Sequence, residues 1–550
     1  MNQMRLVSPI FFVLCGMLHG KLTIGWKENL LTIKDDRNPE GTLEVWYLEA
    51  YCRAGSTDRD WDETVIGHQT KLISANGTEI KLRCELADGV IVDHEITAEG
   101  DKVLFLLTAR NPTDKKSEVH WAQPCIRVGN FTGTRNDKDK YLYLKNSFIF
   151  LDGKQSHMPT VNWATSARYV PGQVWCPCHV PKTDVNPRPL SVDQPSNGLI
   201  GCVSADEKWL MATAWEPYQE LFQGVIRCLH SDFRIGGLEA GEEKEIRGAI
   251  YVMANDTSAL LERYEKDFPD QVRRHQTLRA PKVTAGDPAP GKRIMMTSPE
   301  YAGTKVHHSL YLPENWNPKW KDAKQSYPLI VEYSGNRAPS LGSSGRIEDS
   351  VLGYGLSGGE AVWLNLPFVD ADGQANQPNW WGDEAATVAY TKKVVPEIIK
   401  EYGVDPDRVI LCGFSRGAIA VNYIGLHDDE IADLWSGFVT HDHYDGVREW
   451  RGTKWGAPLG SYRKAAAARF KRIKSRPVLI CQNGGTSEIR ELIGSPENVS
   501  FLDTDTRAIF GIYPTQTDIH PHTDRWLLKP SGQRNEAWVW MKKRGFLVEK

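Results

Sequence analysis

The stretch that decides the fold of the C-terminal half is Val409-Ile-Leu-Cys-Gly-Phe-Ser-Arg-Gly417, which continues into the helix-compatible run Ala418-Ile-Ala-Val421. An apolar run that enters a Gly-x-Ser-x-Gly motif and leaves it as a helix is typical of a serine held at a sharp strand-to-helix turn. Such a turn strains the serine backbone and leaves no room for side chains on the neighbouring residues. Gly413 and Gly417 meet this requirement because they have no side chain. The pattern predicts Ser415 as a nucleophile.

The residues upstream of this motif support the same interpretation. Residues 387–402 carry apolar side chains at helical spacing and end at Gly403, a typical C-terminal cap. Helix, tight turn, buried strand, serine turn and helix is the order found around the nucleophile of α/β-hydrolases. From about Tyr327 to its end, the chain therefore resembles the α/β-hydrolase superfamily, near secreted feruloyl esterases and polyhydroxybutyrate depolymerases. The resemblance implies a mostly parallel sheet flanked by helices.

The base of such an enzyme is a histidine that comes last in the chain order. Two histidines, His520 and His522, precede a closing amphipathic helix expected at residues 534–543. We favour His522, because the run from His522 to Trp526 resembles the histidine loop of these esterases, whereas His520 lies between an isoleucine and a proline.

Three carboxylates are candidates for the acid that orients this histidine. Asp442 and Asp445 follow the expected strand at residues 437–440, and Glu488 follows the next one, at residues 476–481. Some members of the superfamily, certain glucuronoyl esterases among them, place the acid after the earlier strand, which makes Asp442 the first choice. Glu488 has an alternative role at the start of a helix, where a carboxylate is favourable. The sequence leaves all three open.

The oxyanion of an acyl-transfer reaction needs backbone donors. The amide of Arg416, directly after the nucleophile, is one expected donor, and the second is expected in the turn after the strand at residues 328–334. Gly335 and Asn336 are the candidates in that turn, which has an ordinary β-turn as its alternative interpretation.

A polar loop after the expected strand at residues 361–367 ends in Trp380 and Trp381. Because ligands bind at the carboxyl ends of parallel strands, these indoles are candidates for stacking on a sugar or an aromatic acyl group. Asp383 is a candidate acceptor for substrate hydroxyls. Packing of at least one tryptophan onto the core is the alternative.

The remainder of the chain predicts a second, different domain. The protein has 550 residues, too many for one ordinary domain, and residues 21–285 alternate polar and apolar side chains between Asn-Gly and Asp-Gly turns. This alternation predicts an antiparallel β-sandwich at residues 21–285, with carbohydrate as its candidate ligand. The catalytic domain is then expected at residues 286–550. Candidates for lining a sugar groove, with core packing as the alternative for the aromatics, are Trp175, Trp209, Trp215, Tyr218 and His230-Ser-Asp232.

Residues 1–20 combine a charged start, an apolar run and a small residue, which predicts a secretory signal peptide and a secreted or periplasmic protein. The apolar run is too short to span a membrane.

A net charge of −4 without any basic block gives no reason to expect nucleic acid as a partner. The motif Cys176-Pro-Cys178-His179 lacks a second ligand pair, so no metal site is expected, and no cofactor is implied.

The sequence therefore predicts a two-domain, secreted serine hydrolase of carboxylic esters that works through an acyl-enzyme. The expected substrate is a small-molecule or polymer ester, such as an acylated polysaccharide or a polyester. Two alternatives stay open: a serine peptidase or amidase of the same fold, and a carbohydrate-binding protein whose hydrolase domain has lost activity.

Overall fold

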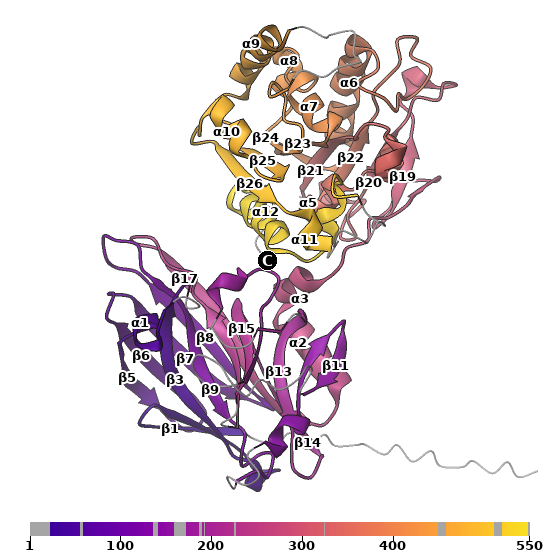
Figure 1. Ribbon diagram of the computed structural model, residues 1–550. Helices are drawn as coiled ribbons and strands as arrows, with labels where there is room; N and C mark the ends of the chain where they lie inside the picture. Colours follow the sequence, from indigo (N-terminus) through magenta and orange to yellow (C-terminus); the bar gives the residue numbers. More distant parts are fainter. Residues whose placement is uncertain are drawn as a thin grey trace, which may run out of the picture. The chain divides into compact units, whose positions relative to one another are not determined.

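The computed structural model describes residues 22–55, 59–135, 141–158, 172–185, 190–191, 193–224, 227–323, 325–448, 458–510 and 520–547 (Figure 1). The expected leader at residues 1–20 lies outside them. The chain divides into two compact units, Met1–His275 and Gln276–Lys550. The sequence predicts a boundary near residue 285, whereas residues before it already bond within the second unit: Leu278 N donates to Leu528 O at 2.8 Å.

The N-terminal unit contains two antiparallel sheets, shown in indigo to magenta in Figure 1. The first has the strand order β1-β2-β3-β9-β16-β15-β12, with β4 paired to β3. Its strands are β1 (Leu22–Lys27), β2 (Leu30–Asp35), β3 (Leu43–Arg53), β4 (Val65–Ile66), β9 (Val119–Arg127), β12 (Gly172–Trp175), β15 (Tyr218–Gly224) and β16 (Cys228–Arg234).

The second sheet has the strand order β11-β10-β13-β14-β17-β8-β7-β6-β5. Its strands are β5 (His68–Ala75), β6 (Glu79–Leu86), β7 (Ile91–Glu99), β8 (Lys102–Arg110), β10 (Ser147–Leu151), β11 (Lys154–His157), β13 (Pro195–Val203), β14 (Trp209–Glu216) and β17 (Glu243–Ala254). The antiparallel sheets predicted from the sequence are confirmed.

Strict alternation of side chains explains why these residues form half-buried strands. In β6, Ile80 and Leu82 are buried, while Lys81 forms an exposed cross-strand ion pair with Glu95 on β7. One apolar cluster draws residues from both sheets, including Val45 of β3 and Phe105 of β8, so the sheets share a core.

Helices α2 (Thr257–Asp267) and α3 (Pro269–His275) close the N-terminal unit, while α1 (Trp61–Thr64) is a single turn. Asp256 caps α2 by accepting from the amides of Ser258 and Ala259. The aromatic candidates for a sugar groove lie inside this unit: Trp175, Trp215 and Tyr218 are at most 1% exposed, so core packing is the correct interpretation for these three.

The C-terminal unit contains a mixed sheet with the strand order β18-β19-β20-β22-β21-β23-β24-β25-β26. The pairs of β20 with β19 and β22 are antiparallel and the others are parallel. The strands are β18 (Val283–Thr284), β19 (Arg293–Met296), β20 (His308–Tyr311), β21 (Tyr327–Tyr333), β22 (Val362–Leu366), β23 (Val404–Phe414), β24 (Gly437–His441), β25 (Val478–Asn483) and β26 (Val499–Thr504).

Helices cover both faces of this sheet. On one face α6 (Glu384–Tyr402) and α7 (Arg416–Tyr423) pack on Leu329 and Leu411, and on the other α5 (Leu352–Ser357) and α12 (Gly532–Lys543) pack on Ile330 and Ile410. The shorter or peripheral helices are α4 (Trp320–Ala323), α8 (Asp429–Ala432), α9 (Leu459–Phe470), α10 (Ser487–Ile493) and α11 (Thr506–Phe510). Within the described ranges, no helix is long and apolar enough to cross a bilayer.

Candidate active site

Ser415 occupies the turn between β23 and α7. Its φ of 57° and ψ of −120° lie in a backbone region that side chains rarely adopt, and its amide donates to His441 O at 2.9 Å. The strained conformation lifts the residue out of both the strand and the helix, so the hydroxyl stands at the carboxyl end of the sheet.

The two glycines of the motif are required by close backbone contacts. A Cβ on Gly413 would lie 2.2 Å from Gly417 O, and a Cβ on Gly417 would lie 2.1 Å from Tyr333 O. Any larger residue would push α7 away from β21 and β23. The tight packing of the helix start against two strands therefore fixes the position of Ser415.

The structure brings Ser415, His522 and Asp442 together in one hydrogen-bonded chain. Nε2 of His522 lies 3.0 Å from the Ser415 hydroxyl, and Nδ1 of the same ring lies 2.7 Å from Oδ2 of Asp442. Because an ionised carboxylate can only accept, Nδ1 carries the proton and Nε2 is left to accept from the serine. This geometry allows the imidazole to remove the hydroxyl proton.

Asp442 follows β24 and is 2% exposed. Its second oxygen, Oδ1, accepts from the Asn483 amide at 2.7 Å and from the Gln482 side chain at 3.2 Å. Burial opposes its ionisation, but the neighbouring histidines and these donors outweigh burial and lower the pKa of Asp442 to about 2. The carboxyl group is therefore ionised at neutral pH.

The other two candidate acids are held elsewhere by arginines. Asp445 is fully buried, forms an ion pair with Arg469 at 2.7 Å and accepts from the Tyr462 hydroxyl. Glu488 forms an exposed ion pair with Arg448 at 3.2 Å. Of the three carboxylates left open by the sequence, Asp442 is the one that the structure joins to His522.

A second imidazole, His443, lies beside Ser415, and sequence analysis did not single it out. Nδ1 of His443 is 3.4 Å from the Ser415 hydroxyl, and its ring centroid is 4.7 Å from that of His522. Burial, followed by the neighbouring His522, lowers the pKa of His443 to about 4, so this ring is neutral at neutral pH. The only signal in the sequence is that histidines flank Asp442 on both sides.

The proposed oxyanion donors lie around the same turn. The amide of Arg416 is the first of α7, and the first amides of a helix have no partner within it. Gly335, after β21, lines a small cavity of about 50 Å³ together with Phe414 and His522. A Cβ on Gly335 would lie 3.0 Å from the Phe414 ring, so the loop closely approaches the strand that precedes Ser415.

The side chain of Arg416 ties the surrounding loops together, a role that the sequence did not reveal. The guanidinium is 1% exposed and donates to the carbonyls of Ser334, Gly345, Gln377 and Trp380. Burial lowers the pKa of Arg416, and the carbonyl oxygens stabilise its positive charge by accepting hydrogen bonds. The same loops hold the oxyanion candidates, since the Asn336 side chain accepts from the Trp380 amide at 2.8 Å.

The two tryptophans of the following loop differ in exposure. Trp381 is 4% exposed and packs against Phe368 and Tyr423, so its side chain belongs to the core and is not available to a substrate. Trp380 is partly buried and lies edge-on to Trp381 with ring centroids 5.4 Å apart. Asp383 caps α6 by accepting from the Ala386 amide at 2.8 Å, which is a structural role.

Polar residues line the cavities next to the chain of Ser415, His522 and Asp442. A cavity of about 200 Å³ borders His443 and is lined mainly by polar and charged groups, among them Arg448, Gln482, Asn483 and Glu488. Asp349, Asp524 and Arg525 line the small cavity at His522. A larger cavity of about 460 Å³ borders Arg416 and shares Ser344, Gly345 and Arg346 with the small one.

No protein-family model matches the chain, and no curated protein matches it. Solved structures show a partial likeness. A thermostable esterase is 15% identical, with 46% of this chain and 62% of that one covered and a TM-score of 0.28. The feruloyl esterase module from Clostridium thermocellum, solved with sinapinate, is 11% identical over 46% of this chain and 95% of its own, with a TM-score of 0.28.

A different kind of protein also matches: one provisionally described as an aldose 1-epimerase, from Escherichia coli K12. It is 12% identical over 43% of this chain and 99% of its own, with a TM-score of 0.25. The chain spans about three fifths of the first esterase, and TM-scores this low carry no argument about activity. The functional conclusion therefore rests on the geometry of the site.

Proposed function

We propose that the protein is a serine hydrolase of carboxylic esters that acts through an acyl-enzyme. The observation that carries the proposal is the chain from Ser415 through His522 to Asp442, with contacts of 3.0 and 2.7 Å, on a serine with strained backbone. These are the distances at which a base can take a hydroxyl proton and an acid can orient that base.

In the proposed first step, Nε2 of His522 accepts the Ser415 proton while the serine oxygen attacks the ester carbonyl carbon. The ring then carries a positive charge, which the ionised Asp442 stabilises through Nδ1. His522 returns the proton to the departing alcohol, which leaves an ester on Ser415. A water molecule, deprotonated by the same ring, releases the acid and restores the serine.

The negative oxygen of the tetrahedral intermediate is proposed to bind to the Arg416 amide and to the turn at Gly335. Support comes from the position of Arg416 as the first residue of α7, where the helix dipole also favours negative charge. The buried Arg416 side chain supports this arrangement because it holds Ser334, directly before Gly335, at 3.2 Å.

The substrate class that we propose is an ester of a polar, hydroxyl-rich alcohol, such as an acylated polysaccharide. The cavity beside His443 is lined with amide, carboxylate and guanidinium groups, which can form hydrogen bonds with hydroxyls but offer little apolar surface to a long acyl chain. This lining favours acylated carbohydrate over a polyester.

The test is reaction with a fluorophosphonate probe, followed by kinetics with matched substrates. The proposal expects labelling of the wild type, no labelling of Ser415→Ala, and faster hydrolysis of p-nitrophenyl acetate than of a peptide anilide. An acetylated oligosaccharide should be cleaved in preference to p-nitrophenyl decanoate. A preference for the anilide would assign the site to a peptidase, and the absence of labelling in folded wild type would remove covalent catalysis.

A further inference from the structure

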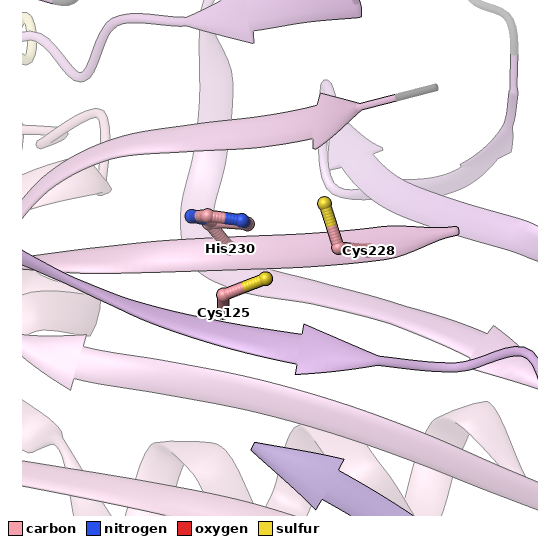
Figure 2. A group of neighbouring side chains, drawn as sticks. All are labelled: Cys125, Cys228 and His230. Atoms are coloured by element: carbon pink, nitrogen blue, oxygen red, sulfur yellow. The ribbon is translucent and has the colours of Figure 1, made fainter. Parts of the chain in front are cut away.

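Three side chains that the proposed hydrolysis does not use meet inside the first sheet of the N-terminal unit. Cys125 lies on β9, and Cys228 and His230 lie on β16 (Figure 2). Their sulfur and nitrogen atoms lie within 4.8 Å of one another, and all three residues are at most 1% exposed. Such a group of thiols and imidazole is chemically a ligand set for a soft metal ion.

The strand register explains how these residues come together. Leu229 pairs with Ile126, so the next position places His230 opposite Cys125, while Cys228 is two residues before His230 on the same face. Ile126 and Leu229 point into the core shared by the two sheets. Cys125 and Cys228 therefore point to the opposite face, as Figure 2 illustrates for the three labelled side chains.

Apolar side chains pack around the two thiols on this face of the sheet. Cys125 and Cys228 pack with Val174, Val180 and Phe222, and the Phe222 ring lies edge-on to His230 at 5.1 Å between centroids. Burial of this kind strengthens the bond between a cation and thiolates, because it limits the access of water to both.

His230 is already oriented for a ligand. Its Nδ1 lies 3.3 Å from Oδ1 of Asp232, and Oδ2 of Asp232 accepts from the Gln123 side chain at 3.3 Å. Among the described residues, Nε2 of this buried ring has no hydrogen-bond partner. Imidazoles that bind metals typically donate their other nitrogen to a carboxylate in this manner.

A second group, Cys178 with His179 and His275, is a weaker candidate. Nε2 of His179 already lies 3.0 Å from Tyr218 O, and Nε2 of His275 lies 3.2 Å from the Tyr218 hydroxyl. Two imidazole nitrogens are therefore engaged within the protein. Nδ1 of His179 also lacks a hydrogen-bond partner among the described residues, but this second group is only partly buried, whereas Cys125, Cys228 and His230 are at most 1% exposed.

We propose that Cys125, Cys228 and His230 bind one thiophilic d¹⁰ cation, Zn²⁺ or Cu⁺. Thiolate and imidazole suit both ions, and bond lengths of about 2.3 Å to sulfur and about 2.0 Å to nitrogen need only a small contraction of the present spacing. The bound cation joins β9 to β16 and raises the stability of the N-terminal unit, because an unfolded chain offers no preformed site. This proposal does not depend on the proposed hydrolysis.

The first experiment uses the full wild-type chain, purified under reducing conditions. We expect about one equivalent of Zn²⁺ or Cu⁺ by mass spectrometry, and a melting temperature that falls on chelation and recovers when Zn²⁺ or Cu⁺ is added back. Separate titrations with each ion decide between them. Replacement by Co²⁺ should give a thiolate-to-cobalt charge-transfer band and the visible bands of a tetrahedral site.

Variants then locate the site. Cys125→Ser, Cys228→Ser and His230→Gln should each abolish the charge-transfer band, and Asp232→Asn, which keeps the side-chain shape, should weaken binding by about 10–100-fold. The control is Cys84→Ala, a buried cysteine of the second sheet whose sulfur bonds to Thr70, and it should bind like wild type.

Three results would overturn the proposal. The first is a wild-type chain that binds less than about 0.1 equivalent of either ion with its thiols reduced. The second is a disulfide between Cys125 and Cys228 in the freshly purified chain, found by peptide mass spectrometry. The third is metal binding that Asp232→Asn and the two serine variants leave unchanged. Melting of wild type with and without chelator stays decisive if the ligand variants fail to fold.

Discussion

The candidate active site and the Cys125–Cys228–His230 group differ in how their polar atoms are satisfied. At the active site, both ring nitrogens of His522 have partners, one in Ser415 and one in Asp442. In the N-terminal unit, Asp232 engages one nitrogen of His230, and the other is buried without a hydrogen bond among the described residues. Burying a polar atom without a partner costs free energy.

This difference indicates two kinds of site. The hydrogen-bonded chain at Ser415 is complete without a ligand, as expected of a preorganised catalytic group that must act on whichever substrate arrives. The thiol and imidazole group becomes complete only when a cation binds, as expected of a structural metal site. Each site can therefore be removed by substitutions that should not affect the other.

The largest expected effect is that of Ser415→Ala. The rate of p-nitrophenyl acetate hydrolysis should fall by roughly 10⁴–10⁶-fold, the usual loss for a nucleophile in a serine triad. Metal content should stay at the wild-type value, because the hydrogen-bond partners of Ser415 lie within residues 419–522, in the C-terminal unit. Kinetics and metal analysis on one preparation make the measurement, with Ser500→Ala on β26 as the control.

The reciprocal variant is Cys228→Ser, which should lose metal and keep fluorophosphonate labelling of Ser415. Loss of labelling in a folded Cys228→Ser chain would mean that the two sites are not independent. Substantial hydrolysis by Ser415→Ala would assign the activity to another residue.

The second expected effect concerns the acid. Asp442→Asn should lower kcat by about 10⁴-fold, because the amide would stabilise the wrong tautomer of His522 and could not stabilise its charge. Glu488→Gln removes a carboxylate that pairs with Arg448, and kcat for p-nitrophenyl acetate, which is too small to fill the cavity that Glu488 lines, should stay within about 2-fold of wild type. If the two variants exchanged these effects, the assignment of Asp442 would be wrong.

The acid shows where the sequence stops being informative. Ser415 and His522 could be predicted because chain order and a glycine motif identify them, whereas Asp442, Asp445 and Glu488 all follow parallel strands that end at the same edge of the sheet. The choice between them depends on tertiary contacts, such as the amide of Asn483 on Asp442 and the guanidinium of Arg469 on Asp445. The sequence around each carboxylate does not specify these tertiary contacts.

The same reason explains what was missed elsewhere. The antiparallel sheets of the N-terminal unit follow from alternating polar and apolar residues, a local property, and were predictable, whereas the mostly parallel sheet was expected from the resemblance around the serine motif. Cys125 and His230 come from segments far apart in the chain and meet only through the register of β9 and β16. Trp381 was predicted to bind a ligand because it ends a polar loop, but its contact with Tyr423 of α7 places it in the core.

The third prediction concerns the stability of the protein at acidic pH, because both units contain buried histidines with lowered pKa values. His94 lies between the hydroxyls of Tyr47 and Tyr51, and burial lowers its pKa to about 3. Burial also lowers the pKa of His441 to about 4, against the opposing charge of Asp442. Between these values and about 6.5, the unfolded chain binds protons that the folded chain does not, so stability falls as the pH falls through this range.

The variant that checks this is His441→Gln, which keeps a donor for Thr523 O. It should reduce the loss of unfolding free energy between pH 7 and pH 5 by about 2 kcal/mol, measured by urea denaturation. His157→Gln replaces an exposed histidine and should leave the pH dependence unchanged. An equal pH dependence in His441→Gln and wild type would show that His441 is protonated in the folded chain.

The smallest expected effect is that of His443→Gln, and comparing it with His522→Gln separates the roles of the two imidazoles beside Ser415. Only His522 has the 2.7 Å contact with Asp442, so His522→Gln should lower kcat by about 10⁴-fold or more, as loss of a catalytic base does. His443 is farther from the hydroxyl, at 3.4 Å, and lines the polar cavity of about 200 Å³. His443→Gln should therefore raise KM and change kcat by less than about 10-fold.

Kinetics of both variants with an acetylated oligosaccharide make the comparison, and p-nitrophenyl acetate serves as the control because it is too small to fill the cavity. A larger KM effect on the oligosaccharide than on the small ester would identify His443 as a substrate contact. Equal losses of kcat in His443→Gln and His522→Gln would contradict this division, since the ring with the lowered pKa of about 4 would then act in proton transfer as well.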